Sequence, residues 1–285
     1  MGRLRYCLPS DIVTALAVVT ASGSISADPQ YGFTALYDKI PAKPLKFETV
    51  GPIRLVFDFG EAQRIDAFAL PNHNLGAESA CVVALNNTNV WTAPTCVVAM
   101  PTGADHLDGH VASPWADFTT ASGYSSAGFR FCSLFVPVQS VNIKIGETLL
   151  MANLRRFNHE PQFGGNKGAI RRYLESLRTE FGVVRVNRRR IKQRCYAFML
   201  KGSTVDYEAI QSLCDDAGGV ADPWFFTPDD AVKIDLGLYV RFTEETAQKL
   251  TSTEEFFYVP SGAANRGFVE NFPLTVEEVS RSLPL

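Results

Sequence analysis

The sequence predicts a mainly β protein, with a β-sandwich of the jelly-roll type followed by a smaller α+β domain that has an antiparallel sheet and one packed helix. Three observations predict this. Short apolar or alternating runs, separated by Gly, Pro, Asn and Asp, recur through the first half. The second half combines alternating segments with one helical segment. Between them, the glycine-rich stretch HEPQFGGNKG at 159–168 is typical of a linker. The predicted domains are therefore residues 1–160 and 165–285.

The first half opens with a segment, SDIVTALAVV, that fits two structures. It could begin as a short helix capped at Ser10, although its β-branched residues suit a strand equally well. Strands are then expected at 53–59, 64–70, 80–85, 95–100, 129–136 and 141–146. The run RIDAFAL has mainly apolar residues on both faces, which is typical of an inner strand, and Pro71 ends it because proline lacks the N–H that a ladder requires.

The second half is predicted to begin with a strand, a turn and a second strand within residues 180–200. A helix is expected next, at 203–219. Ser203 with Asp206 three residues later is a capping signature, and Gly218 ends the helical pattern.

The remaining segments complete the predicted sheet. Residues 231–242 alternate almost perfectly, which indicates a strand with one buried and one solvated side, and 268–280 predicts a final strand. The aromatic cluster DPWFFTPDD at 222–230 fits a buried corner or an exposed patch that a partner covers. We favour the buried corner, because an apolar strand follows at once.

Composition places the chain among globular proteins. The hydrophobic fraction is 46%, the charged fraction 20% and the net charge −3, which does not suit a chain that binds nucleic acid over its whole surface. No run approaches the roughly 20 apolar residues needed to cross a bilayer, so no membrane insertion is expected. Six scattered cysteines without a CxxC pair are expected to be reduced and buried.

Charge is distributed unevenly along the chain. Residues 167–194 carry 10 basic and 2 acidic side chains, whereas residues 202–285 carry 5 basic and 15 acidic ones. The basic run could bind nucleic-acid phosphate, or it could contact the acidic segment of a neighbouring copy, which would build a ring. We favour the contact between copies. The candidate residues for either role are Arg185, Arg188, Arg189, Arg190, Lys192 and Arg194.

The sequence contains no recognisable catalytic constellation. The motifs GxSxG, GxGxxG and the Walker loop are absent, and adjacent carboxylates in a strand point to opposite faces. His106 and His110 lie four residues apart, but the glycines around them predict a loop and not a shared helical face. We therefore expect no enzyme activity, no metal and no cofactor.

The segment PNHN after RIDAFAL supplies the candidate glycan contact. Asn72 and Asn74 are good turn formers and His73 lies between them, so the three residues fit a turn at the rim of the sandwich. The alternative is that Asn72, His73 and Asn74 engage a host glycan from that rim.

A family resemblance adds to this interpretation. The stretch IRLVFDFGEAQRIDAFAL resembles the discoidin-like (galactose-binding-like) jelly roll, and the upstream Ala-Leu-Tyr-Asp element is similar to the one that precedes its first sheet strand. Together with LPNHNL, the later RRF and PQFGGNKG, the layout resembles minor tail and baseplate proteins of tailed bacteriophages. The loop arginines and aromatic residues of the sugar-binding members have no counterparts that we can place here.

The resemblance implies a non-enzymatic structural protein of a bacteriophage virion. Such a protein would be made in the host cytoplasm, form a homo-oligomeric ring in the tail tip or baseplate, and dock other tail proteins close to DNA in the tail channel. One alternative is a carbohydrate-binding module that engages host surface glycans. Another is a component of the neck or head–tail connector.

Overall fold

The computed structural model describes residues 5–26, 28, 31–39, 43–76, 80–100, 114–157, 169–172, 175–178, 184–187, 192–227, 237–251 and 268–278. The chain divides into two compact units. One comprises Met1–Phe157 with Trp224–Tyr239, and the other comprises Asn158–Pro223 with Val240–Leu285. The first unit thus ends beside the predicted linker, and it also includes a short segment from the second half of the sequence.

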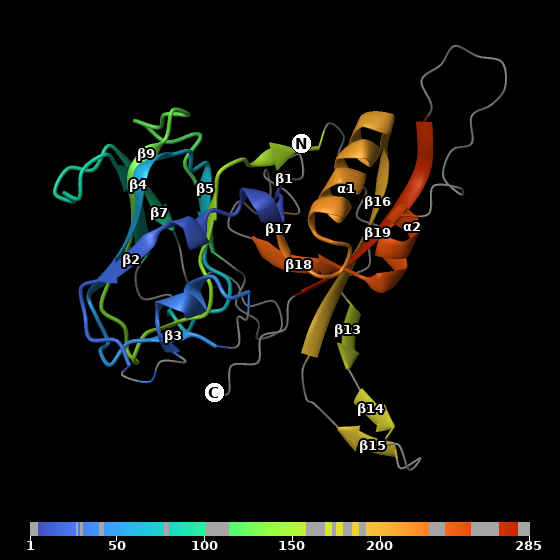
Figure 1. The fold of residues 1–285 in the computed structure, drawn as a ribbon, viewed down its shortest axis with the longest axis horizontal. Coiled ribbons are helices and arrows are strands. Elements are labelled where there is room, and N and C mark those ends of the chain that lie inside the picture. The colour runs from blue at the N-terminus through green and yellow to red at the C-terminus, as the bar shows by residue number, and fades with distance from the viewer. Residues whose placement is uncertain are drawn as a thin grey trace. The chain divides into compact units, whose positions relative to one another are not determined.

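The first unit contains a β-sandwich, as the sequence predicts (Figure 1). A five-stranded antiparallel sheet has the order β2–β4–β9–β6–β7. Its strands are β2 (Val18–Ala21), β4 (Ile53–Gln63), β9 (Phe129–Val136), β6 (Cys81–Asn86) and β7 (Cys96–Met100). A three-stranded sheet has the order β11–β5–β8, with β11 (Leu149–Met151), β5 (Ala67–Ala69) and β8 (Trp115–Asp117). β3 (Leu45–Lys46) pairs with β10 (Lys144–Ile145). All six strands predicted in this half are present, with shorter bounds for β5 and β10.

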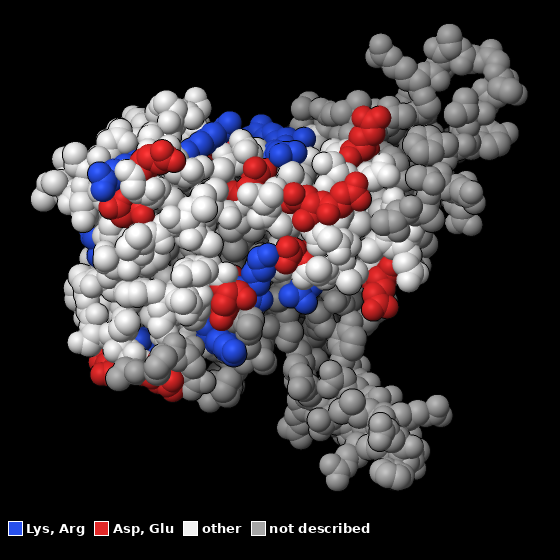
Figure 2. All heavy atoms as spheres, viewed as in Figure 1, with Lys and Arg blue, Asp and Glu red and all other residues white. Residues whose placement is uncertain are grey.

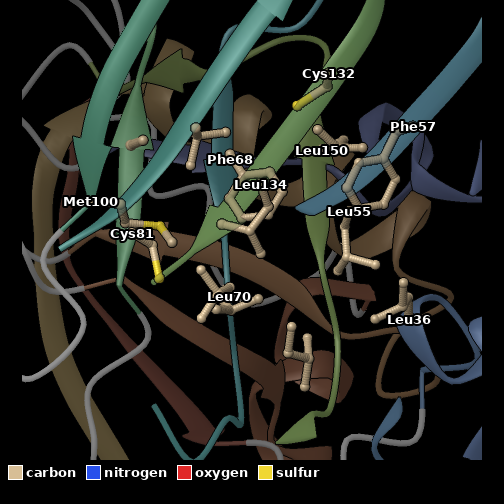
Figure 3. Close-up of a cluster of buried hydrophobic side chains, with 14 of the residues drawn as sticks. Leu36, Leu55, Phe57, Phe68, Leu70, Cys81, Met100, Cys132, Leu134 and Leu150 are labelled. Carbon is tan, nitrogen blue, oxygen red and sulfur yellow. The ribbon is translucent and has the colours of Figure 1, made fainter. Parts of the chain in front are cut away.

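Alternation along the strands places one face of each sheet in a shared core. In β4, Leu55 and Phe57 belong to this core, whereas Arg54 and Val56 lie on the opposite face. Phe57 of the five-stranded sheet packs edge-to-face with Phe68 of the three-stranded sheet, with 6.3 Å between ring centroids (Figure 3). The two sheets therefore form the two layers of the sandwich.

Cysteines contribute to this core as apolar side chains. The five cysteines whose side chains are described are free and buried, namely Cys7, Cys81, Cys96, Cys132 and Cys214. Burial raises the pKa of the Cys81 thiol to about 12 and the pKa of Cys132 well above its ordinary value. These thiols stay protonated near neutral pH, which makes them poor nucleophiles.

RIDAFAL forms the inner strand that its pattern predicts, because β5 lies between β11 and β8 and is buried on both faces. Asp66, directly before β5, is only 1% exposed. Its carboxylate accepts two hydrogen bonds of 2.8 Å from Arg64, one from the Tyr124 hydroxyl and one of 3.1 Å from the Leu154 backbone N–H. The buried charge is thus paired and hydrogen-bonded, as a stable structure requires.

Removal of this carboxylate should destabilise the sandwich. We expect Asp66→Ala to lower the free energy of unfolding by about 3 kcal/mol, because the Tyr124 hydroxyl and the Leu154 N–H lose their acceptor. Urea denaturation followed by tryptophan fluorescence measures the change. The control, Glu61→Ala, replaces an exposed acid. It should change the free energy of unfolding by no more than about 0.5 kcal/mol. An equally small effect of Asp66→Ala would show that the network does not stabilise the fold.

The first unit contains a further group of paired strands. β1 (Arg5–Cys7) pairs antiparallel with β12 (Arg155–Arg156) and with β17 (Trp224–Thr227). β17 is the aromatic cluster of the sequence, and Trp224, Phe225 and Phe226 are all fully buried. The prediction that these aromatic side chains are buried is therefore confirmed, although the residues form a strand and not a corner.

The sequence of the segment at 10–19 allows either a short helix or a strand, and the structure contains both kinds of element there. Two single-turn 3-10 helices, Pro9–Asp11 and Thr14–Leu16, precede β2, and another, Phe33–Leu36, precedes β3.

The second unit has an antiparallel sheet with helices packed on it. β16 (Lys192–Ser203) pairs with β13 (Ala169–Arg172) and β19 (Phe268–Glu278), and β19 also pairs with β18 (Leu238–Phe242). β14 (Glu175–Arg178) pairs with β15 (Val184–Asn187). α1 (Thr204–Asp216) packs on β16 and β19, and α2 (Glu244–Thr251) packs on α1 and β19.

These elements agree with the predictions for the second half, with one addition. The two predicted strands, the helix and the final strand are present as β15, β16, α1 and β19, whereas the turn predicted between the two strands lies outside the described residues. The prediction of a single packed helix missed α2, a short and mostly polar segment that lacks a clear apolar stripe. Of the strand predicted at 231–242, residues before 237 lie outside the described part. None of the described helices is long and apolar enough to cross a membrane.

Candidate functional site

The turn that the sequence singled out is packed into the edge of the sandwich. Asn72 and His73 are each 5% exposed, and Asn72 has a left-handed backbone, with φ of 57°. Nδ1 of His73 accepts a hydrogen bond from the backbone N–H two residues later. The Asn74 side chain donates to the Asn142 carbonyl at 2.8 Å and accepts from the Lys144 N–H at 2.7 Å. These side chains hold a turn, and their burial leaves little surface for the glycan contact considered above.

The basic candidate residues are only partly within the described structure. Arg185 lies in β15, and Lys192 and Arg194 lie in β16, whereas the three consecutive arginines at 188–190 lie outside the described residues. The histidine pair at 106 and 110 also lies outside them. Among the residues that are described, no group of three or more His, Cys, Asp or Glu side chains could hold a metal ion.

The outer face of the five-stranded sheet brings together residues that the sequence did not connect. Strand register places Arg54, Phe135 and Val82 in one row across β4, β9 and β6, and none of the three belongs to the core cluster. In the next row, Ser133 and Ala84 are at most 1% exposed although they also lie on this outer face. Other groups must therefore cover the middle of the face.

Arg54 and Trp91 provide part of this cover. The guanidinium carbon of Arg54 lies 5.5 Å from the centroid of the Trp91 ring and 5.1 Å from that of Phe135. Nη1 of Arg54 donates a 3.0 Å hydrogen bond to the Ser133 hydroxyl. Burial lowers the pKa of Arg54 from its ordinary value, although the group stays charged. We call the set of Arg54, Trp91 and Phe135 the aromatic platform. It is held by cation–π contacts.

Asn86 anchors the connection that carries Trp91. This residue ends β6 and is 7% exposed. Its Nδ2 donates to the Val90 carbonyl at 2.8 Å, and its Oδ1 accepts from the Thr95 hydroxyl at 2.9 Å. The indole N–H of Trp91 donates to the Asn89 side chain at 2.8 Å. One buried amide thus ties both ends of the β6–β7 connection, which positions Trp91.

A second arginine lies on an aromatic ring of the same sheet face. Arg130 lies 4.8 Å from the Phe131 centroid and donates to both carboxylate oxygens of Asp58, at 3.0 and 3.1 Å. The hydrogen bond from Arg130, with a second from the Gly60 N–H, lowers the pKa of Asp58. This exposed ion pair provides hydrogen-bonding groups on the outer face.

The sequence carries one weak signal for the aromatic platform. Trp91 lies in the polar stretch NNTNVW, and a half-buried tryptophan in a polar connection between two strands is unusual. Arg54 and Phe135 lie in predicted strands. Their meeting depends on the β4–β9 register, which local patterns do not define.

Comparisons with known proteins give only distant structural matches. No protein-family model and no curated protein matches the chain. Chitosan-binding module 1 of a Paenibacillus sp. IK-5 chitosanase/glucanase is 16% identical over 48% of this chain and 96% of its own, with a TM-score of 0.35. A Streptococcus pneumoniae fucose-binding module is 12% identical over 50% and 95%, with a TM-score of 0.37. SpGH29 is 13% identical over 51% of this chain and 29% of its own length, with a TM-score of 0.37.

Two of these three matches are sugar-binding modules by name, and none is named as a phage tail protein. Their identities and TM-scores are low, and the fold of this chain is defined by its own strands and their pairing.

Proposed function

We propose that the first unit is a non-catalytic carbohydrate-binding module that holds a sugar on the aromatic platform. The observation that carries this proposal is a half-buried tryptophan supported from below by a charged arginine, on the outer face of a sheet.

The aromatic platform suits a pyranose ring for two reasons. One face of such a ring presents C–H groups that pack on a flat aromatic surface, while the hydroxyl groups at its edge require hydrogen-bonding partners. Trp91 offers the flat surface, and the Arg130–Asp58 pair offers donors and acceptors on the same sheet face. Arg54 and Asn86 hold Trp91 before any ligand arrives, which reduces the entropy lost on binding.

Loss of the indole should weaken sugar binding strongly. A glycan array with the intact chain identifies the ligand, and isothermal titration calorimetry then compares Trp91→Ala with the unaltered protein. We expect affinity to fall about 10- to 100-fold, as when a central aromatic anchor is truncated. Val138→Ala is the matched control, because Val138 is 55% exposed and lies outside the aromatic platform. Absence of any glycan ligand, or equal affinity of Trp91→Ala, would contradict the proposal.

A structural role in a phage tail is a second candidate, in accordance with the resemblance seen in the sequence. The observation that favours an assembly role lies in the second unit, where strand pairing gathers basic residues and α1 carries acidic ones. Self-association through these two surfaces can be tested directly and does not depend on sugar binding.

A further inference from the structure

Strand pairing in the second unit builds a basic ribbon, which we define as β13, β14, β15 and the start of β16 up to Cys195. β13 pairs with the beginning of β16, and β14, the next strand after β13, pairs with β15, the strand before β16. The ribbon carries six basic residues within its strands, namely Arg171, Arg172, Arg178, Arg185, Lys192 and Arg194, against one acidic residue, Glu175. Three of these, Arg171, Arg172 and Arg178, were not among the candidates from sequence.

The register of β13 with β16 brings basic residues close together in the ribbon. Arg172 lies directly opposite Lys192, and Arg194 lies two residues further along β16, which places it on the same face of the ladder. Like charges directly opposite one another destabilise a pair of strands. An anionic partner on this face would relieve the repulsion.

Helix α1 presents the opposite charge. Its residues include Asp206, Glu208, Asp215 and Asp216 and no Lys or Arg. Glu208 and Asp215 are exposed, and acidic side chains gather over α1 in Figure 2. Asp215 and Asp216 also lie in the last turn, where the helix dipole already concentrates negative charge, so a cation is favoured there.

The helix of the same chain is too short to cover the like-charged pair. α1 follows β16 directly and has 13 residues, so it extends about 20 Å. The strand from Ser203 back to Lys192 extends about 35 Å. Lys192 and Arg172 therefore lie beyond the reach of their own α1.

We propose that the basic ribbon of one copy of this chain docks on the α1 helix of a second copy. Charge complementarity supports this partner, because the strands of the ribbon carry six basic residues and one acidic residue whereas α1 carries four acidic residues and no basic ones. The two contact surfaces differ, so the contact is heterologous, and its repetition gives a closed ring or an open filament. This proposal is independent of sugar binding by the first unit.

Charge-swapped pairs of the full chain test the proposal. Sedimentation equilibrium at 50 mM NaCl should show self-association of the unaltered protein, weakened at least about tenfold at 500 mM NaCl by screening. Arg172→Glu/Lys192→Glu and Glu208→Lys/Asp215→Lys should each lose association, because each places like charges across the contact. An equimolar mixture of the two variants should regain it, since complementary surfaces then meet. Lys43→Glu/Arg156→Glu makes the same change of charge at exposed positions of the first unit and should associate normally.

Several outcomes would overturn the proposal. The proposal is wrong if the unaltered protein is monomeric at all salt and protein concentrations. It is also wrong if the mixture of swapped variants stays monomeric although circular dichroism shows that both variants are folded. If a swapped variant does not fold, Arg172→Gln/Lys192→Gln replaces it, and unchanged association of that variant also counts against the contact. A 30-base-pair DNA duplex is a separate probe, and its binding through Arg172 and Lys192 without self-association would assign the ribbon to nucleic acid instead.

Discussion

Glu147→Gln should make the protein markedly more stable above neutral pH. The Glu147 side chain is 2% exposed, and one carboxylate oxygen accepts a 3.0 Å hydrogen bond from the Lys39 backbone N–H. The other oxygen has no hydrogen-bond partner among the described residues. Burial raises the pKa of Glu147 to about 8 from an ordinary value of 4.5.

The raised pKa determines how stability depends on pH. Between pH 4.5 and about pH 8 the folded state keeps a proton that the unfolded state has lost, so the free energy of unfolding falls as pH rises. Above pH 8 both states are ionised and the loss is complete, on the order of 3–5 kcal/mol. Glutamine is neutral at every pH and retains the acceptor for Lys39, so this loss disappears.

Urea denaturation at pH 5, 7 and 8.5 measures the effect. The variant and the unaltered protein should be similar at pH 5, and the variant should be more stable by about 3 kcal/mol at pH 8.5. Glu61→Gln is the control, because Glu61 is exposed and should leave the pH dependence unchanged. Parallel curves for Glu147→Gln and the unaltered protein would show that Glu147 ionises normally in the fold.

Gly123→Ala is the second substitution with a large expected effect, and it should destabilise the first unit by about 3 kcal/mol or more. Gly123 has φ of 80°, and a Cβ placed on it would lie 2.0 Å from the Thr95 carbonyl oxygen. The clash is with backbone, so the chain itself must move, and the left-handed conformation adds a further cost for alanine. Thermal unfolding followed by circular dichroism measures the loss.

Gly60→Ala separates the two contributions to this effect. Gly60 has a similar φ of 77°, but nothing lies within 4 Å of the Cβ position. Gly60→Ala should therefore lower the free energy of unfolding by only about 1 kcal/mol, because alanine is disfavoured in this backbone conformation. Equal losses for the two variants would show that the approach of Gly123 to Thr95 is not tight.

Displacement of Thr95 should also affect the aromatic platform. The Thr95 hydroxyl donates to Asn86, the residue that anchors the connection carrying Trp91. A folded Gly123→Ala protein should therefore bind sugar more weakly than the unaltered protein, although the substitution does not touch the aromatic platform itself.

Local patterns predicted those parts of the fold in which a single segment carries its own signal. The run at 129–136 and RIDAFAL became β9 and β5 because each is a short and mainly apolar run, which is typical of a buried strand. The helix at 203–219 was recognisable from its N-terminal cap and its terminal glycines, and α1 occupies most of that range.

Features that depend on distant pairing were not predictable in this way. Nothing in GETLL indicates that Glu147 is buried, because its burial results from the packing of the segment around Lys39. The meeting of Trp91 with Arg54 depends on the β4–β9 register and on the path of a polar connection. Likewise, the Arg172–Lys192 pair follows from the register of β13 with β16, which residue composition cannot specify.

The position of β17 late in the sequence affects how the protein folds during synthesis. β1 lies at the start of the chain, but one of its two partners, β17, begins at Trp224, and Phe225 of that strand packs 5.8 Å from the Trp115 ring. During synthesis on a ribosome, β1 cannot pair with β17 until most of the second unit has been synthesised. Until then β1 has an unpaired edge, at which the first unit can misfold or aggregate. A fragment cut at residue 160 would remain permanently in that state.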